Sequence, residues 1–138
     1  MTTLRFCRAA VAVPVLFGAI AASAPAPAPA PVPMALEILE KGAWELTSRV
    51  PGEARIKLCL GDPRQMIQVR HLSNRCTFHV IENRPNHATV HYSCPGAGHG
   101  RTTLRIETSR LAQVHTQGIA EAAPFVLVYE ARRKGACR

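Results

Sequence analysis

The sequence predicts a mainly β protein: an antiparallel meander of about seven strands that forms a curved sheet or half-open barrel, with one short helix and two disulfides. Three observations lead to this class. Apolar and polar residues alternate in short runs along the last two thirds of the chain. An apolar leader and a proline-rich stretch precede these runs. Four of the five cysteines lie beyond the leader, an even number that is typical of disulfide-bonded exported domains.

Each predicted strand is a run in which every second residue is apolar. The runs lie at about 44–50, 56–60, 76–80, 90–94, 103–107, 111–114 and 125–130. Trp44 falls on an apolar strand face, which indicates a core position. One segment breaks the pattern: Asp62 and Pro63 suit the N-cap and first position of a helix that we expect to continue to about Leu72.

The first residues have the order of a secretory signal. Two arginines, Arg5 and Arg8, precede the uncharged apolar run Ala9–Ala22, which ends in small residues. That run is shorter than the roughly 20 residues that span a bilayer, so we expect cleavage and no transmembrane segment afterwards. We therefore divide the chain into a signal peptide (1–22), a Pro/Ala-rich linker (23–35) with an extended backbone, and a disulfide-stapled β domain (36–138).

The four remaining cysteines are Cys59, Cys76, Cys94 and Cys137. Two pairings compete, because sequence alone does not fix connectivity. Cys59–Cys76 with Cys94–Cys137 would pin the predicted helix, and this is the pairing we favour. Alternatively, a hairpin centred on Pro85 places Cys76 directly opposite Cys94, at a distance that permits a bridge.

The formal net charge is +8, which suits an anionic partner. The charge is spread along the chain, with only a short basic cluster at 132–134, so we expect no specific nucleic-acid binding. An anionic envelope component or a protein partner is the partner that this composition favours.

The candidate ligand contacts are His79, His91, His99 and Arg101. The hairpin register places His79 opposite His91 on the face away from the apolar residues, where two imidazoles are able to bind a ligand or exchange a proton. His99 and Arg101 follow in a glycine-rich stretch that we interpret as a loop between strands. The spacing of His91, Cys94 and His99 also resembles a zinc site, but an oxidising compartment favours cystine, so we predict no metal and no cofactor.

Several motifs together resemble the domain of unknown function family 3617, a family of small exported proteins of Gram-negative bacteria. These motifs are Gly42-Ala43-Trp44-Glu45, Leu58-Cys59-Leu60-Gly61-Asp62-Pro63, Cys76, Tyr92-Ser93-Cys94-Pro95-Gly96 and the stretch from Glu130 to Cys137. They cover nearly the whole predicted domain. The resemblance implies a periplasmic location and a cystine-bearing β domain, and it implies no activity or catalytic residues.

No familiar catalytic motif is present in the sequence. The prediction is therefore a noncatalytic periplasmic or envelope protein that binds an envelope component or a protein partner. The alternative is a small, basic, secreted hydrolase of the ribonuclease type that uses surface histidines for general acid–base cleavage.

Overall fold

The computed structural model describes residues 30–138, so the predicted signal peptide and most of the predicted linker lie outside it. The elements are α1 (Met34–Glu37), β1 (Gly42–Ser48), β2 (Ile56–Leu60), the 3₁₀ turn η1 (Pro63–Met66), β3 (Thr77–Arg84), β4 (His87–Cys94), β5 (Gly98–Thr108), β6 (Leu111–Ala120) and β7 (Ala123–Gly135). The mainly β class and the seven strands of the prediction are confirmed.

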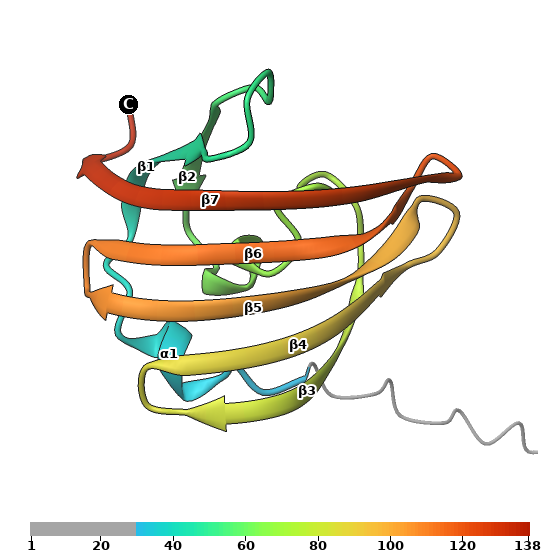
Figure 1. Ribbon diagram of the computed structural model, residues 1–138. Coiled ribbons are helices and arrows are strands. Elements are labelled where there is room, and N and C mark those ends of the chain that lie inside the picture. The colour runs from blue at the N-terminus through green and yellow to red at the C-terminus, as the bar shows by residue number, and fades with distance from the viewer. Residues whose placement is uncertain (1–29) are drawn as a thin grey trace, which may run out of the picture.

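The strands form one open antiparallel sheet in the order β2-β1-β7-β6-β5-β4-β3. Strands β3 to β7 are a meander in which each strand pairs with the next, and β1 then pairs with β7 at the far side. The sheet curls, so that β1 and β2 lie behind one end of β7 (Figure 1). The helical turns α1 and η1 lie on the inner, concave side of the sheet. Strands β2 and β3 are the two edges, and the barrel therefore stays open.

The core lies between the inner face of the sheet and the segments that cover it. Period-two alternation explains it, because every second residue of a strand points to the same face. Trp44 is 1% exposed and its indole N–H donates to the carbonyl of Glu40 (2.9 Å), which confirms the predicted core position. The largest fully buried side chains are Trp44, Tyr92, Tyr129, Leu36, Leu46, Leu60, Met66, Ile67, Leu104, Val90, Val114 and Thr102.

The predicted helix from Asp62 to Leu72 is wrong in length. The cap is as predicted, because Asp62 and Gln65 form a reciprocal capping box. The helix ends at Met66. The residues that follow are held by tertiary contacts, since Ile67 is fully buried and its carbonyl accepts a hydrogen bond from the buried hydroxyl of Thr102. The loop that follows is held by Gln68, whose side-chain amide donates to the carbonyls of His71 (2.7 Å) and Asn74 (2.9 Å).

A short helical turn, α1, begins at Met34, within the last residues assigned to the linker. Its Ala35 and Leu36 are fully buried in the core. The backbone N–H of Met34 donates to the side chain of Asn83 on β3 (2.8 Å). The chain is thus packed against the domain from at least this turn onward.

The disulfides are Cys59–Cys137 and Cys76–Cys94, so the pairing favoured from the sequence is wrong and the alternative is confirmed. The reason is the register of the β3–β4 hairpin. Phe78 lies opposite Tyr92, and this register carries Cys76 to Cys94 with a Cα–Cα distance of 4.1 Å. Two disulfides indicate an oxidising compartment. Within residues 30–138, no helix is long and apolar enough to cross a bilayer.

Candidate functional site

The outer face of the sheet carries a row of polar side chains that crosses four strands. His79 on β3 pairs with His91 on β4, His91 with Arg101 on β5, and Arg101 with Gln117 on β6. The predicted register of His79 opposite His91 is therefore confirmed. All four side chains are exposed, because they occupy the positions that alternate with the buried residues of each strand.

The structure brings three of the four predicted ligand contacts into one hollow of about 370 Å³. His91, His99 and Arg101 line it, together with Gly100, Gln117, Gly118, Phe125 and Val126. The rings of His91 and His99 lie with their centroids 5.9 Å apart and tilted by 42°. The fourth residue, His79, lies one strand further out, beside His91 and outside the hollow.

A smaller hollow of about 150 Å³ adjoins the first one and shares Arg101 and Gln117 with it. Thr103 and His115 complete its lining. Arg101 therefore lies between two depressions, with donors on both sides. We call the set His91, His99, Arg101, His115 and Gln117 the Arg101 face.

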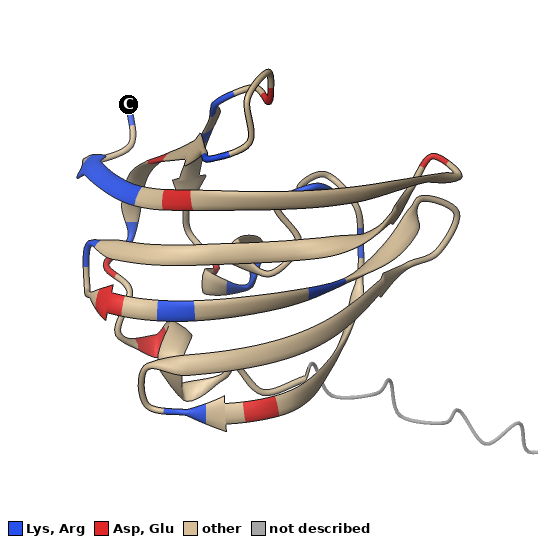
Figure 2. Ribbon diagram, viewed as in Figure 1, with Lys and Arg blue, Asp and Glu red and all other residues tan. Residues whose placement is uncertain are grey.

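No carboxylate among residues 30–138 lines either hollow. Strands β4 and β6, which flank Arg101, contain no acidic residue, as Figure 2 illustrates. Among the described residues, Arg101 takes part in none of the ion pairs, whereas Arg105 and Arg132 each have a glutamate partner. The hydrogen bond from Arg132 is the main reason that the pKa of Glu130 is lowered. Arg101 is thus a cation whose field is not offset by a neighbouring acid.

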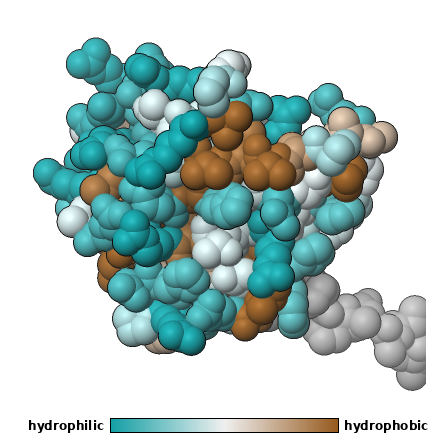
Figure 3. Space-filling model, viewed as in Figure 1, coloured by the Kyte–Doolittle hydropathy of each residue, from teal (hydrophilic) through white to brown (hydrophobic). Residues whose placement is uncertain are grey.

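Apolar side chains border the Arg101 face along β7 (Figure 3). Val126 is 57% exposed and lies opposite Gln117 in the β6–β7 register. A ligand on the Arg101 face thus contacts a guanidinium, imidazoles and a small apolar border. This combination suits an anion with an organic body.

The turn beneath this site is held from the inner side of the sheet. Nε2 of the buried His71 donates to the carbonyl of Ala97 (3.3 Å), which leaves Nδ1 to accept from the hydroxyl of Tyr92 (3.1 Å). Burial raises the pKa of Tyr92. A Cβ on Gly100 would lie 2.6 Å from the Tyr92 hydroxyl, so only glycine allows this ring to pack under β5. The glycine-rich stretch is a turn only as far as Ala97. Strand β5 begins at Gly98, so the prediction of a loop at His99 and Arg101 is wrong and both residues lie on a strand.

In the zinc interpretation Cys94 would supply the thiolate, but this cysteine is bonded to Cys76. In the part of the chain that the structure describes, no three His, Cys, Asp or Glu side chains are grouped as metal ligands would be. Neither the His91 ring nor the His99 ring forms a hydrogen bond with another described residue. Within residues 30–138, no hydrogen-bond partner therefore orients either ring for proton transfer.

Sequence reasoning missed His115, Gln117 and Val126. The signal was present, because His115 and Gln117 continue the polar half of the alternation along β6. The predicted strand stopped at Val114 and did not follow this alternation into the next residues. Their proximity to Arg101 also needs the β5–β6 register, which no local pattern supplies.

Comparisons with known proteins give no match for this chain among protein-family models, curated proteins or solved structures.

Proposed function

We propose that this protein is a noncatalytic exported protein that binds a phosphate-bearing, anionic component of the cell envelope on the Arg101 face. The observation that carries the proposal is an exposed arginine between two hollows with no acidic neighbour on the adjoining strands. A guanidinium presents a planar set of donors that matches two oxygens of one phosphate group. The imidazoles of His91 and His99 lie beside it and supply further donors.

The compartment is part of the proposal. Two disulfides require an oxidising environment, and the leader pattern at residues 1–22 is that of a secretory signal. These two features support the periplasm. The resemblance to the domain of unknown function family 3617 agrees with this location and stays a prediction.

The hydrolase alternative has one observation in its favour, the close approach of the His91 and His99 rings beside Arg101. General acid–base cleavage needs two imidazoles held in position by other groups. Neither ring has a hydrogen-bond partner among residues 30–138, and this favours binding over catalysis.

Binding is tested with the processed protein, purified without reducing agent, against two probes. The probes are vesicles of phosphatidylglycerol and phosphatidylethanolamine, and soluble inorganic polyphosphate. We expect Arg101→Gln to weaken binding about tenfold, the size of one lost charge-assisted hydrogen-bond pair. Preference for vesicles identifies a lipid headgroup, and preference for polyphosphate identifies a soluble phosphate polymer.

The matched control is Arg75→Gln, which removes the same charge from an exposed loop arginine outside both hollows and outside every other binding surface described below. It should leave the affinity for both probes unchanged. Equal losses in the two variants would mean nonspecific attraction to a basic protein and would overturn the proposal. RNA cleavage by the wild-type protein that is lost in His91→Ala would replace it with the hydrolase.

A further inference from the structure

Another hollow lies away from the Arg101 face, between β1, β2 and residues 134–138. Its volume is about 390 Å³, within the range of small-molecule sites. An adjoining hollow of about 500 Å³ shares Ala43, Lys134 and Arg138 with it. We call this the C-terminal cleft, and its lining residues are Ala43, Trp44, Glu45, Lys57, Leu58, Cys59, Lys134, Cys137 and Arg138.

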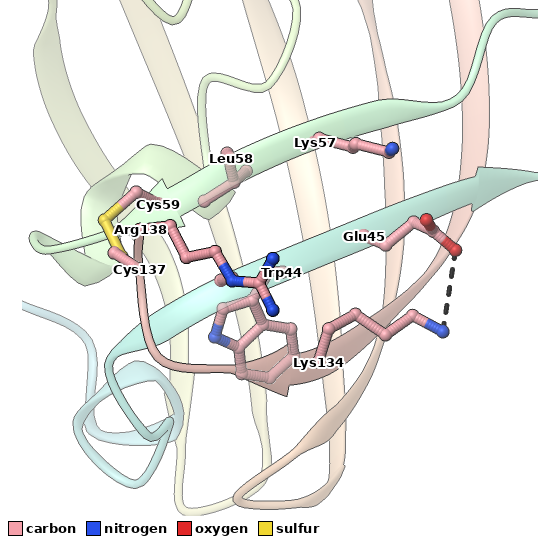
Figure 4. Close-up of a pocket in the computed structure, with 9 residues that line it drawn as sticks. Trp44, Glu45, Lys57, Leu58, Cys59, Lys134, Cys137 and Arg138 are labelled. Atoms are coloured by element: carbon pink, nitrogen blue, oxygen red, sulfur yellow. Dashed lines mark ion pairs between the residues drawn. A yellow bond between two sulfur atoms is a disulfide. The ribbon is translucent and has the colours of Figure 1, made fainter.

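The charged side chains of the cleft come from three strands and the tail. Lys57 on β2, Glu45 on β1 and Lys134 on β7 extend in the same direction, and Arg138 reaches over β1 from the other side (Figure 4). A ligand between them therefore meets a cation at each end.

The wall that carries Arg138 is fixed covalently. Strand β7 ends at Gly135, and the disulfide between Cys137 and Cys59 then joins the tail to β2, with a Cα–Cα distance of 5.6 Å. Arg138 is thus one residue from a covalent anchor. Holding a binding group in place before the ligand arrives lowers the entropic cost of binding.

The charges of the cleft favour an anion. Among the described side chains that line it are three cations and one carboxylate, and Glu45 is shared between Lys134 and Arg55, each 3.6 Å from the same oxygen. Lys57 and Arg138 form no ion pair with any described residue. Their charges are therefore left for a ligand.

The floor of the cleft is partly apolar. Ala43 has a small side chain that leaves space above β1. Leu58 packs mainly against the core and adds its partly exposed edge to the lining. Trp44, almost fully buried, lies beneath. Apolar surface next to two free cations suits a molecule that has both a charged head and a hydrocarbon part.

We propose that the C-terminal cleft binds a small organic anion, with its carboxylate or phosphate group held by Arg138 and Lys57 and its hydrocarbon part on Ala43 and Leu58. This site is separate from the Arg101 face, and the inference does not depend on the proposed function. It gives the protein a small-molecule ligand in addition to the envelope component.

The experiment uses a reporter that the protein already contains. Trp44 is its single tryptophan and lines the cleft, so its fluorescence reports on ligands bound there. The processed, disulfide-bonded protein is titrated with octanoate, with octyl phosphate and with inorganic phosphate. We expect saturable fluorescence changes with the first two probes, and the tighter of them identifies the head group.

The variants Lys57→Gln and Arg138→Gln should each weaken binding of the tighter probe about tenfold, while Arg75→Gln, at an exposed loop residue that lines neither the cleft nor the Arg101 face, leaves it unchanged. Both substituted side chains are at the surface, so folding is retained and circular dichroism verifies it. The inference is overturned if neither octyl probe saturates, if inorganic phosphate binds as tightly as octyl phosphate, or if the affinities of all variants are equal. Because the vesicle and polyphosphate assay depends on Arg101 and the Trp44 fluorescence assay on Lys57 and Arg138, failure of one proposal is distinguishable from failure of the other.

Discussion

The two edges of the sheet are each secured by a disulfide, but the two bonds act at different ranges. Cys76–Cys94 joins strands that are already paired in one hairpin, with 18 residues of sequence separation. Cys59–Cys137 joins the β2 edge to the tail, across 78 residues. The first bond reinforces a local contact. The second bond forms a wall of the C-terminal cleft and joins the tail after β7 to the edge strand β2.

The largest expected effect comes from removing these bonds. Closing a longer loop restricts the unfolded chain more, so Cys59→Ser/Cys137→Ser should lower the free energy of unfolding by about 4–5 kcal/mol and Cys76→Ser/Cys94→Ser by about 3 kcal/mol. Urea unfolding of the two double variants measures both values. Only the first variant should also lose binding of the tighter of the two probes, octanoate or octyl phosphate, in the C-terminal cleft. The opposite ranking of the two losses would contradict the difference that we draw between the bonds.

Two glycines, one near each site, should have the next largest effect. Gly42 has φ +137° and a Cβ there would lie 2.2 Å from the carbonyl oxygen of Gly135. Gly98 has φ +132°, and a Cβ there would lie 2.0 Å from the carbonyl oxygen of Ile119. Because both the dihedral and the space exclude a side chain, each change to alanine should cost roughly 1–3 kcal/mol.

Gly61→Ala is the control for both glycines, since nothing lies within 4 Å of a Cβ at that position. It should shift the thermal midpoint little in either direction. A loss at Gly61 equal to the losses at Gly42 and Gly98 would show that the close backbone contacts are not the cause.

The smallest expected effect is an acid-range change at Glu40, near the start of β1. Hydrogen bonds from Ser109 and Arg110 lower the pKa of Glu40 below its ordinary value of 4.5. A carboxylate with a lowered pKa in the folded state stabilises the fold above its unfolded pKa, and this contribution is lost as the pH falls through the folded pKa. Stability should therefore decrease below about pH 4.5.

Glu40→Gln should flatten this pH dependence, because the titrating group is gone. Glu37→Gln is the matched control, since Glu37 is exposed and forms no ion pair within residues 30–138. The measurement is the urea midpoint of the wild type and of each variant between pH 5 and about pH 3. If Glu37→Gln flattens the profile equally, the contacts of Glu40 are not responsible.

Much of the fold was predictable because it depends on local patterns. Alternation in the runs around Trp44, Val90 and Leu127 depends only on the geometry of a strand, and the runs became β1, β4 and β7. The hairpin register about Pro85 was also predictable, since it follows from matched spacing on both sides of one turn. The length of the helix after Pro63 was not, because the residues that follow it are held by tertiary contacts, such as the hydrogen bond to Ile67 from Thr102, which is distant in the sequence.

The candidate site divides in the same way. His91 was identifiable as a polar residue on a strand face, whereas Arg101 was expected in a loop and lies on β5. His115 and Gln117 join them only through the pairing of β5 with β6. The C-terminal cleft had no sequence signal, since it depends on the pairing of β1 with β7 and on the bond to Cys137.

By itself, the sequence determined the mainly β class, the seven strands and the cysteines available for two disulfides, because strand alternation and residue composition are local properties of the chain. Tertiary structure decided the cysteine partners and the place of β1 beside β7. It also decided which residues meet on the Arg101 face and in the C-terminal cleft. These depend on contacts between residues far apart in the sequence. Such contacts form only when the whole sheet buries its inner face at once.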